Sequence, residues 1–200
     1  ELVPKTQTPE NWELGYTLPV PFLQLFQEQN GDWQIDTARV HQLARTVRDS
    51  ERPVVVYLFA THFASHAPLE QALAADPRNL AQTRDGEPVY YWNIADREAP
   101  VNLLRRQAAV AMVNALCALE PHHHSKIRAV TLLGEVHHYF PDFEQGMGFG
   151  SPYRVTDYSP ASRAGFRDFL RTRFNTLEAL NQAVGGHYAA WDAIDPPSKD

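Results

Sequence analysis

The sequence Ala129-Val130-Thr131-Leu132-Leu133-Gly134-Glu135-Val136-His137-His138-Tyr139-Phe140 changes character at its middle. Its first residues are mostly apolar or β-branched, which is typical of a strand buried in a sheet. Glu135 follows directly, and because parallel folds bind ligands at the carboxyl ends of strands, the pattern predicts a ligand site there. Desolvation by the aromatic residues beyond it would raise the carboxyl pKa and suit Glu135 to general acid catalysis. The alternative, a solvated loop glutamate after a strand, is open on these residues alone.

Two further apolar runs precede this one. Residues 20–26 and 53–59 read as strands, with Pro19 and Pro21 confined to the start of the first and a nearly continuous apolar run in the second. The second run is typical of a strand covered on both faces. Between them, behind the potential cap Asp36, apolar residues repeat at helical spacing: Val40, Leu43, Ala44 and Val47.

The order of elements predicts the sheet. A short helix is expected over residues 68–75, a long loop over 76–97, and a long helix whose apolar stripe runs from Val101 to Leu119 and which Pro121 ends. The strand before Glu135 follows. Strands separated by helices predict a parallel sheet with right-handed crossovers. Two more helices, capped by Ser159 and ended by Gly185, complete a single predicted domain over residues 1–200.

Composition excludes several classes of protein. The chain has 200 residues, 44% of them apolar and 21% charged, which is ordinary for a globular protein. A formal charge of −6 argues against a nucleic-acid surface, and the arginines at 163, 167, 171 and 173 are expected to form a solvated helix face. No apolar run approaches the length of a membrane span, and Cys117 is expected to be a buried, inert thiol.

Polar and aromatic residues after the predicted strands are candidate ligand contacts. They are His62 and His66 after the strand at 53–59, Trp92 and Asn93 in the long loop, and His137 and Tyr139 after Glu135. Loops of such length are usually functional, although core packing is the alternative for each aromatic. The run from His122 to His124 suggests a metal site only by composition, because consecutive loop residues rarely converge on one ion, and we predict no metal.

The C-terminal third resembles a known family. Phe166-Arg-Asp-Phe-Leu170, then Phe174-Asn-Thr-Leu-Glu-Ala-Leu-Asn181, then Trp191-Asp-Ala-Ile-Asp-Pro-Pro197 are similar to the segment after the fourth barrel strand in the family 42 β-galactosidases. These are retaining glycoside hydrolases of clan A with a (β/α)₈ TIM barrel. The weaker upstream agreement extends the resemblance to roughly residues 20–197. The resemblance implies an α/β fold of TIM-barrel type, of which this chain holds roughly the first half.

The resemblance also implies an activity. Glu135 falls where the family has its general acid/base, at the end of strand four, so the chain is expected to be a glycosidase that cleaves a β-linked sugar with retention. The family has Asn immediately before this Glu, whereas this chain has Gly134, and its nucleophile on strand seven has no counterpart here. Half a barrel would leave open sheet edges, so we expect a longer barrel. The alternatives are a carbohydrate-binding barrel without catalysis and, more remotely, an interaction scaffold.

The expected partner is an oligosaccharide or polysaccharide substrate, with no cofactor, no nucleic acid and no membrane, and assembly into a homo-oligomer is compatible with the sequence. The sequence suits a cytoplasmic protein or one exported to the periplasm or secreted after processing. A chain that begins at Glu1 rather than Met is expected to be a processed or trimmed product.

Overall fold

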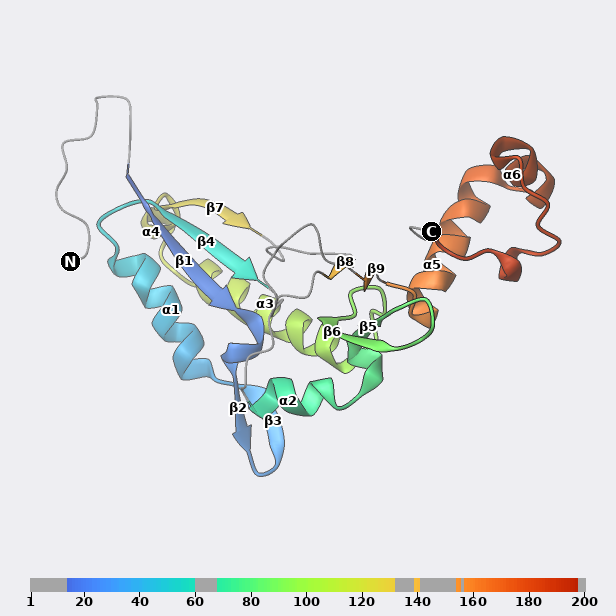
Figure 1. Ribbon diagram of the computed structural model, residues 1–200. Coiled ribbons are helices and arrows are strands. Elements are labelled where there is room, and N and C mark those ends of the chain that lie inside the picture. The colour runs from blue at the N-terminus through green and yellow to red at the C-terminus, as the bar shows by residue number, and fades with distance from the viewer. Residues whose placement is uncertain (1–13, 60–67, 132–138, 141–153, 156, 198–200) are drawn as a thin grey trace. The chain divides into compact units, whose positions relative to one another are not determined.

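The computed structural model describes residues 14–59, 68–131, 139–140, 154–155 and 157–197 (Figure 1). The chain divides into two compact units. Unit 1 comprises Glu1–Thr61 and Leu104–Val136, and unit 2 comprises His62–Leu103 and His137–Asp200. The single domain expected from the sequence stays a prediction. Within the described residues, no helix has the length and hydropathy that crossing a membrane requires.

Unit 1 is built on a parallel sheet of three strands. The strands are β1 (Tyr16–Pro21), β4 (Val54–Phe59) and β7 (Ile127–Thr131), in the order β1-β4-β7. Both neighbouring pairs are parallel, with Leu58 opposite Val20 and Val56 opposite Val130. The predicted arrangement of three adjacent parallel strands is therefore confirmed.

The first strand lies earlier than predicted. Residues 20–26 were expected to form it, but β1 ends at Pro21 and a 3-10 turn, η1 (Phe22–Leu25), follows. The N–H of Tyr16 donates to the carbonyl of Pro53 at 2.8 Å, so by the alternation of a strand Pro19 and Pro21 face away from β4 and no ladder bond is lost. The apolar residues of η1 are buried in the turn, which is why the run looked like a continuing strand.

A β-hairpin between η1 and the first helix was not predicted. Strands β2 (Phe26–Gln29) and β3 (Asp32–Ile35) pair antiparallel. The connection is Asn30-Gly31, with φ of 54° and 86°. Two central residues with positive φ define the tight turn that matches strand twist, and Asn-Gly is its commonest sequence.

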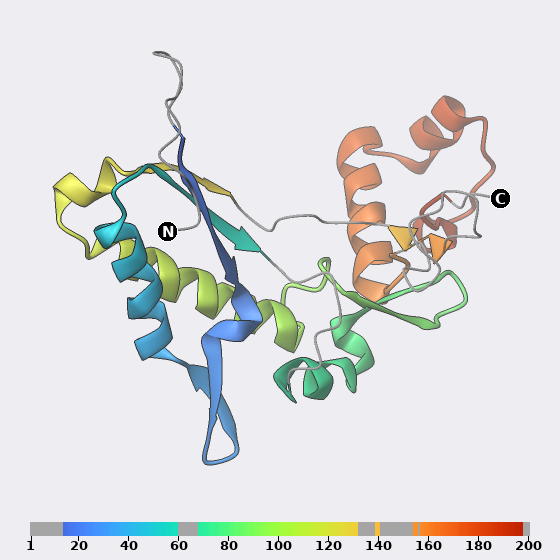
Figure 2. The same cartoon turned by 60° about the vertical axis from the view of Figure 1, so that its left-hand side comes forward.

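Two helices lie on the same side of the sheet (Figures 1 and 2). Helix α1 (Thr37–Asp49) begins as predicted at Asp36, whose carboxylate accepts the N–H of Arg39 at 2.9 Å. Helix α3 (Pro100–Cys117) has 18 residues, and its portion in unit 1 starts at Leu104. The helices bury apolar side chains at helical spacing: Val40, Ala44 and Val47 on α1, and Ala108, Met112 and Leu116 on α3.

Strand β4 shows that helices cover only one face of this sheet. Val54, Val56 and Leu58 are 2%, 0% and 0% exposed, whereas the alternate residues Val55, Tyr57 and Phe59 are half-buried. The rings of Tyr57 and Phe59 stack on each other with centroids 5.2 Å apart. Within the described residues of unit 1, helices thus cover one face of β4, and cover of the other face stays a prediction.

The end of α3 and the turn after it differ from expectation. Cys117 is exposed on the last turn of α3, not buried, because the buried stripe of that turn passes through Leu116. The histidines from His122 to His124 belong to a short helix, α4 (Pro121–His124), and not to an irregular loop.

Unit 2 begins with α2 (Pro68–Ala74), as predicted, and η2 (Pro77–Asn79). The segment 76–97, predicted to be a loop, contains the antiparallel hairpin of β5 (Leu80–Gln82) and β6 (Pro88–Trp92). Its turn is closed by the N–H of Thr83 donating to the carbonyl of Glu87 at 2.9 Å, with Gly86 at a φ of 83°. The Asp85-Gly86 pair marks this turn in the sequence.

The rest of unit 2 contains two longer helices where the sequence predicts them. Helix α5 (Pro160–Phe174) is capped by Ser159, and α6 (Leu177–Val184) ends at Gly185, which has a φ of 64°. The described remainder is irregular apart from the 3-10 turn η4 (Trp191–Ala193) and a pairing of two short strands, β8 (Tyr139–Phe140) with β9 (Arg154–Val155).

Candidate functional site

The predicted catalytic residue follows the sheet of unit 1 in sequence. Strand β7 ends at Thr131, which lies opposite Tyr57 of β4. Because the strands are parallel, their carboxyl ends lie at the same end of the sheet. Glu135 comes four residues after Thr131 and His62 three residues after Phe59. Glu135, His62, His66 and His137 themselves lie outside the described residues. β7 is the third described strand of its parallel sheet, whereas the resemblance puts the acid/base after the fourth.

Trp92 and Asn93 are described, and both side chains are buried, each 3% exposed. The carboxamide oxygen of Asn93 accepts the N–H groups of Ala95 at 2.9 Å and Asp96 at 3.2 Å, and its amide donates to the carbonyl of Arg78 at 3.4 Å. These bonds fix the turn after β6. A role for either residue in binding substrate stays a prediction, as it does for Tyr139, which lies in β8.

Asn79, which the sequence analysis did not single out, organises the same region. It is 1% exposed; its oxygen accepts the N–H of Val101 at 2.9 Å and its amide donates to the carbonyl of Leu73 at 2.9 Å. One side chain thus joins the end of α2 to the first turn of α3. An Asp-Pro-Arg-Asn sequence signals a turn, but no local pattern announces bonds to residues 22 positions away.

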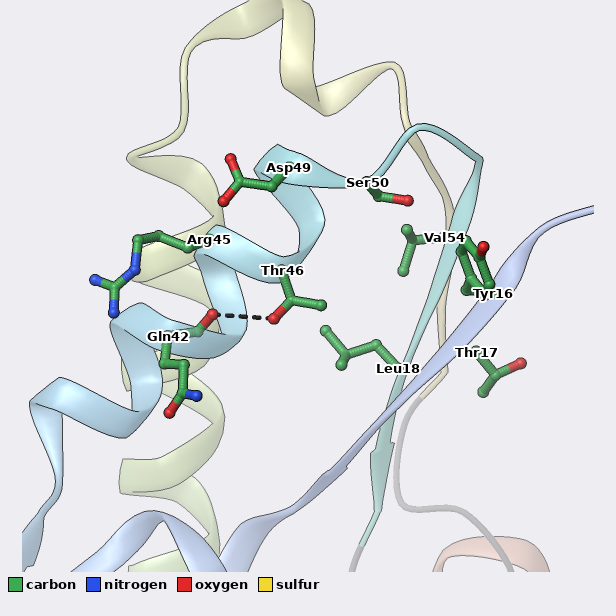
Figure 3. Close-up of a pocket in the computed structure, with 9 residues that line it drawn as sticks. All are labelled: Tyr16, Thr17, Leu18, Gln42, Arg45, Thr46, Asp49, Ser50 and Val54. Carbon is green, nitrogen blue, oxygen red and sulfur yellow. Dashed lines mark hydrogen bonds between the residues drawn. The ribbon is translucent and has the colours of Figure 1, made fainter. Parts of the chain in front are cut away.

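A groove of about 620 Å³ in unit 1 lies at the opposite end of the strands (Figure 3). It runs between the last turns of α1 and the amino ends of β1 and β4, and is lined by Tyr16, Thr17, Leu18, Gln42, Arg45, Thr46, Asp49, Ser50 and Val54. The hydroxyl of Thr46 donates to the carbonyl of Gln42 at 3.1 Å. The hydrogen bond from Arg48 lowers the pKa of the Asp49 carboxyl, which favours its ionised form. In TIM barrels the active site lies at the carboxyl ends of the strands, not at the amino ends, where this groove lies. The groove also has no pair of carboxyl groups, which a glycosidase needs.

The histidines of α4 have separate neighbours. His122 Nδ1 lies 3.4 Å from a carboxylate oxygen of Glu120, and His124 Nε2 lies 3.1 Å from the carbonyl oxygen of Leu116. Burial lowers the pKa of His123, and the neighbouring His122 and Lys126 lower it further. Among the described residues no three potential ligands are grouped for a metal ion.

Two of the four arginines of α5 depart from the solvated face that the sequence predicts: Arg171 and Arg173 are exposed, as predicted, whereas Arg163 and Arg167 are half-buried. Arg167 Nε donates to the carbonyl of Ile194 at 2.7 Å, and its Nη2 lies 3.1 Å from a carboxylate oxygen of Asp195. Arg163 Nε donates to the carbonyl of Tyr158 at 3.0 Å. Their spacing of four residues puts both on one helix face. That face contacts the C-terminal segment, residues 194–197.

No family model matches the chain, and no curated protein matches it. Among solved structures, a cold-adapted β-galactosidase from Rahnella sp. R3 aligns over 92% of this chain and 24% of its own, with 19% identity and a TM-score of 0.52. The catalytic domain of a β-amylase from Paenibacillus polymyxa aligns over 92% of this chain and 46% of its own, with 15% identity and a TM-score of 0.60.

At these identities the likeness shows the fold alone. Both structures are TIM-barrel glycoside hydrolases, and the chain spans about a quarter of one and about half of the other. The mixed α/β architecture with a parallel sheet agrees with part of such a barrel, whereas membership of family 42 is not shown.

Proposed function

We propose that the chain is part of a glycoside hydrolase barrel that cleaves a β-linked sugar with retention, and that Glu135 is its general acid/base. The observation that carries the proposal is the sheet of unit 1, whose parallel strands have their helices on one side and whose third strand precedes Glu135. A sheet wound in one direction suits a barrel, whereas a doubly wound sheet has helices on both faces. The likeness to two glycoside hydrolases supports the same class of enzyme.

The proposed chemistry needs two carboxyl groups. In a retaining glycosidase, one protonated carboxyl assists the leaving oxygen while an ionised carboxylate, about 5–5.5 Å away, attacks the anomeric carbon. Glu135 takes the first role and then, as a base, activates the water that releases the sugar. The second carboxylate comes from a later strand of the barrel.

The rival is a carbohydrate-binding barrel without catalysis, and one observation favours it. Gly134 precedes Glu135 where the family that the sequence resembles has Asn, so the side chain that would hold the sugar's 2-hydroxyl is missing. Hydrogen bonds to that hydroxyl strengthen in the transition state, and their loss would weaken catalysis more than binding.

Substitution of Glu135 tests the proposal. The Glu135→Gln variant of the full-length protein keeps the shape of the side chain and removes the proton donor, so kcat/KM for a natural glycoside should fall by roughly 10²–10⁴. The aryloxide of an activated aryl glycoside leaves without protonation, so the first step with this substrate should slow less in the variant. Azide needs no base and should partly restore its turnover.

Glu28→Gln, an exposed site on the β2–β3 hairpin, is the matched control and should keep parental activity. A parent protein without turnover on any aryl β-glycoside, but with measurable sugar binding, would support the rival. Equal activity of the parent and Glu135→Gln would remove Glu135 from the mechanism.

A further inference from the structure

We propose that the sheet face of unit 1 that is turned away from the helices forms the floor of the sugar site, at the carboxyl ends of β4 and β7. The Phe59 ring is the platform for a sugar ring, and the Thr131 hydroxyl binds one of its hydroxyl groups. The sugar bound there is uncharged. This inference rests on the barrel of the proposed function, because the face of a barrel strand that helices do not cover points into the barrel.

The register of the sheet puts the residues of this floor on one face. Side chains alternate along a strand, and paired residues of neighbouring strands share a face. Val56 and Leu58 are buried on the side of the helices, so Tyr57 and Phe59 lie on the other side (Figures 1 and 2). Thr131 pairs with Tyr57 and shares its face. Phe59 and Thr131 are the last residues of their strands, and TIM barrels have their active sites at these ends.

The Phe59 ring is covered on one side by its neighbour along the strand. The Tyr57 ring stacks on it with centroids 5.2 Å apart and an angle of 19° between the planes. Tyr57 comes two residues earlier in β4, so it covers the side of the Phe59 ring nearer the amino end. The other side faces the carboxyl end of the sheet, and the half-buried ring is partly accessible. The face of an aromatic ring is negative and attracts the slightly positive C–H groups of a pyranose.

The Thr131 hydroxyl has no protein partner. Its oxygen is buried, and within the part of the chain that the structure describes, no group forms a hydrogen bond with it. Buried hydroxyl groups are normally hydrogen-bonded, so this one indicates a bound molecule that completes the pairing. A sugar hydroxyl both donates and accepts hydrogen bonds and therefore suits it. The proposed acid/base, Glu135, follows the same strand four residues later.

The floor carries no charge. The residues paired at the carboxyl end of this face are Pro19, Pro21, Tyr57, Phe59 and Thr131. Small-molecule sites combine a mostly apolar and aromatic lining with a few polar groups, as this floor does. A carboxylate or phosphate on the sugar would lose water here without gaining a counter-charge from these residues. The floor therefore favours a neutral hexose over an acidic sugar or a sugar phosphate.

Kinetics of the full-length protein on nitrophenyl β-galactoside and β-glucoside test the hydroxyl contact. Thr131→Val keeps the shape of the side chain and removes the hydroxyl, so kcat/KM should fall roughly 3- to 10-fold. Its free energy of unfolding should stay the same or rise, because a buried hydroxyl without a protein partner does not stabilise the fold. Thr17→Val makes the same change at the amino end of β1 and should leave kcat/KM unchanged. An unchanged kcat/KM in Thr131→Val would overturn the contact.

Monodeoxy analogues of the better substrate identify the sugar hydroxyl. One analogue should react more slowly than the parent sugar with the parent protein, and this loss should disappear in Thr131→Val because the contact is already gone. Equal losses in both proteins for every analogue would contradict a direct contact.

Replacement of the ring tests the platform. Phe59→Leu keeps an apolar side chain and removes the aromatic face, so the sugar should bind roughly 3- to 10-fold more weakly in calorimetric titration. A lower melting temperature with unchanged sugar affinity would mean that Phe59 only packs in the core. For the uncharged sugar, nitrophenyl β-glucuronide should react at least tenfold more slowly than the glucoside, and a preference for the glucuronide would overturn this part.

Failure of this inference is distinguishable from failure of the proposed function. Turnover by the parent that neither Thr131→Val nor Phe59→Leu changes overturns the floor alone. A parent without turnover that binds galactose or glucose, with weaker binding in both variants, overturns the glycosidase and supports the floor. A parent that neither hydrolyses nor binds these neutral sugars overturns the floor as well.

Discussion

The sheet of unit 1 and the C-terminal segment of unit 2 are held by different forces. On one face of strand β4, the side chains are at most 2% exposed, and the helices beside it bury apolar residues against that face. Helix α5 has no fully buried side chain. Instead, its arginines bind backbone carbonyls and Asp195, and the Tyr158 hydroxyl donates to the carbonyl of Pro197 at 2.9 Å. The comparison teaches that apolar burial forms the sheet, whereas the segment beside α5 combines polar contacts with the buried side chain of Ile194.

The largest expected difference between the two regions is in stability. Leu58→Ala removes a side chain that is 0% exposed in the central strand of the sheet, so the free energy of unfolding should fall by about 2–5 kcal/mol. Val55→Ala, on the other face of the same strand, should cost clearly less because Val55 is half-buried. Urea unfolding followed by circular dichroism measures both. Equal losses would mean that both faces of β4 are packed in the full-length protein.

A smaller effect is expected at the C-terminal segment. Arg167→Gln removes a hydrogen bond to Ile194 and a partly exposed ion pair, which together are worth about 1 kcal/mol. Amide exchange at Ile194 should accelerate in this variant, and about 0.5 M NaCl should accelerate it in the parent. Arg173→Gln is the control, since its guanidinium lies over the Phe174 ring at 5.8 Å and not at the segment. Salt-insensitive exchange at Ile194 would show that charge does not hold this segment.

The smallest expected effect is the pH dependence contributed by His123. Burial, with help from His122 and Lys126, lowers its pKa in the folded state, so the unfolded chain binds this proton more readily. Stability should therefore be retained above pH 6.5, the ordinary value, and should decline as the pH falls below it. His123→Gln should make the change in melting temperature between pH 7 and pH 5 smaller. An unchanged slope would assign that pH dependence to other groups.

The sequence predicts the sheet of unit 1 well because its signals are local. Apolar runs and helical spacing place β4 and α1, and caps at Asp36 and Ser159 place the starts of two helices. The first strand was misplaced because Phe22, Leu23 and Leu25 are buried in a turn, and burial alone does not distinguish a turn from a strand.

Other features depend on tertiary contacts and could not be predicted. The one-sided cover of β4 depends on where α1 and α3 pack, which an apolar run does not specify. The role of Arg167 depends on Asp195, 28 residues later in the chain. Four residues of the candidate site lie outside the described residues: Glu135, His62, His66 and His137. The Asn93 side chain accepts backbone N–H groups of the turn that follows it.

The stereochemistry of hydrolysis tests the proposed function most directly. Proton NMR during hydrolysis of an aryl β-glycoside by the full-length protein distinguishes the first-formed anomer before mutarotation. A retaining mechanism predicts that the β-anomer appears first. Initial release of the α-anomer would contradict the retaining role of Glu135, and the absence of hydrolysis across aryl β-glycosides would contradict a β-glycosidase.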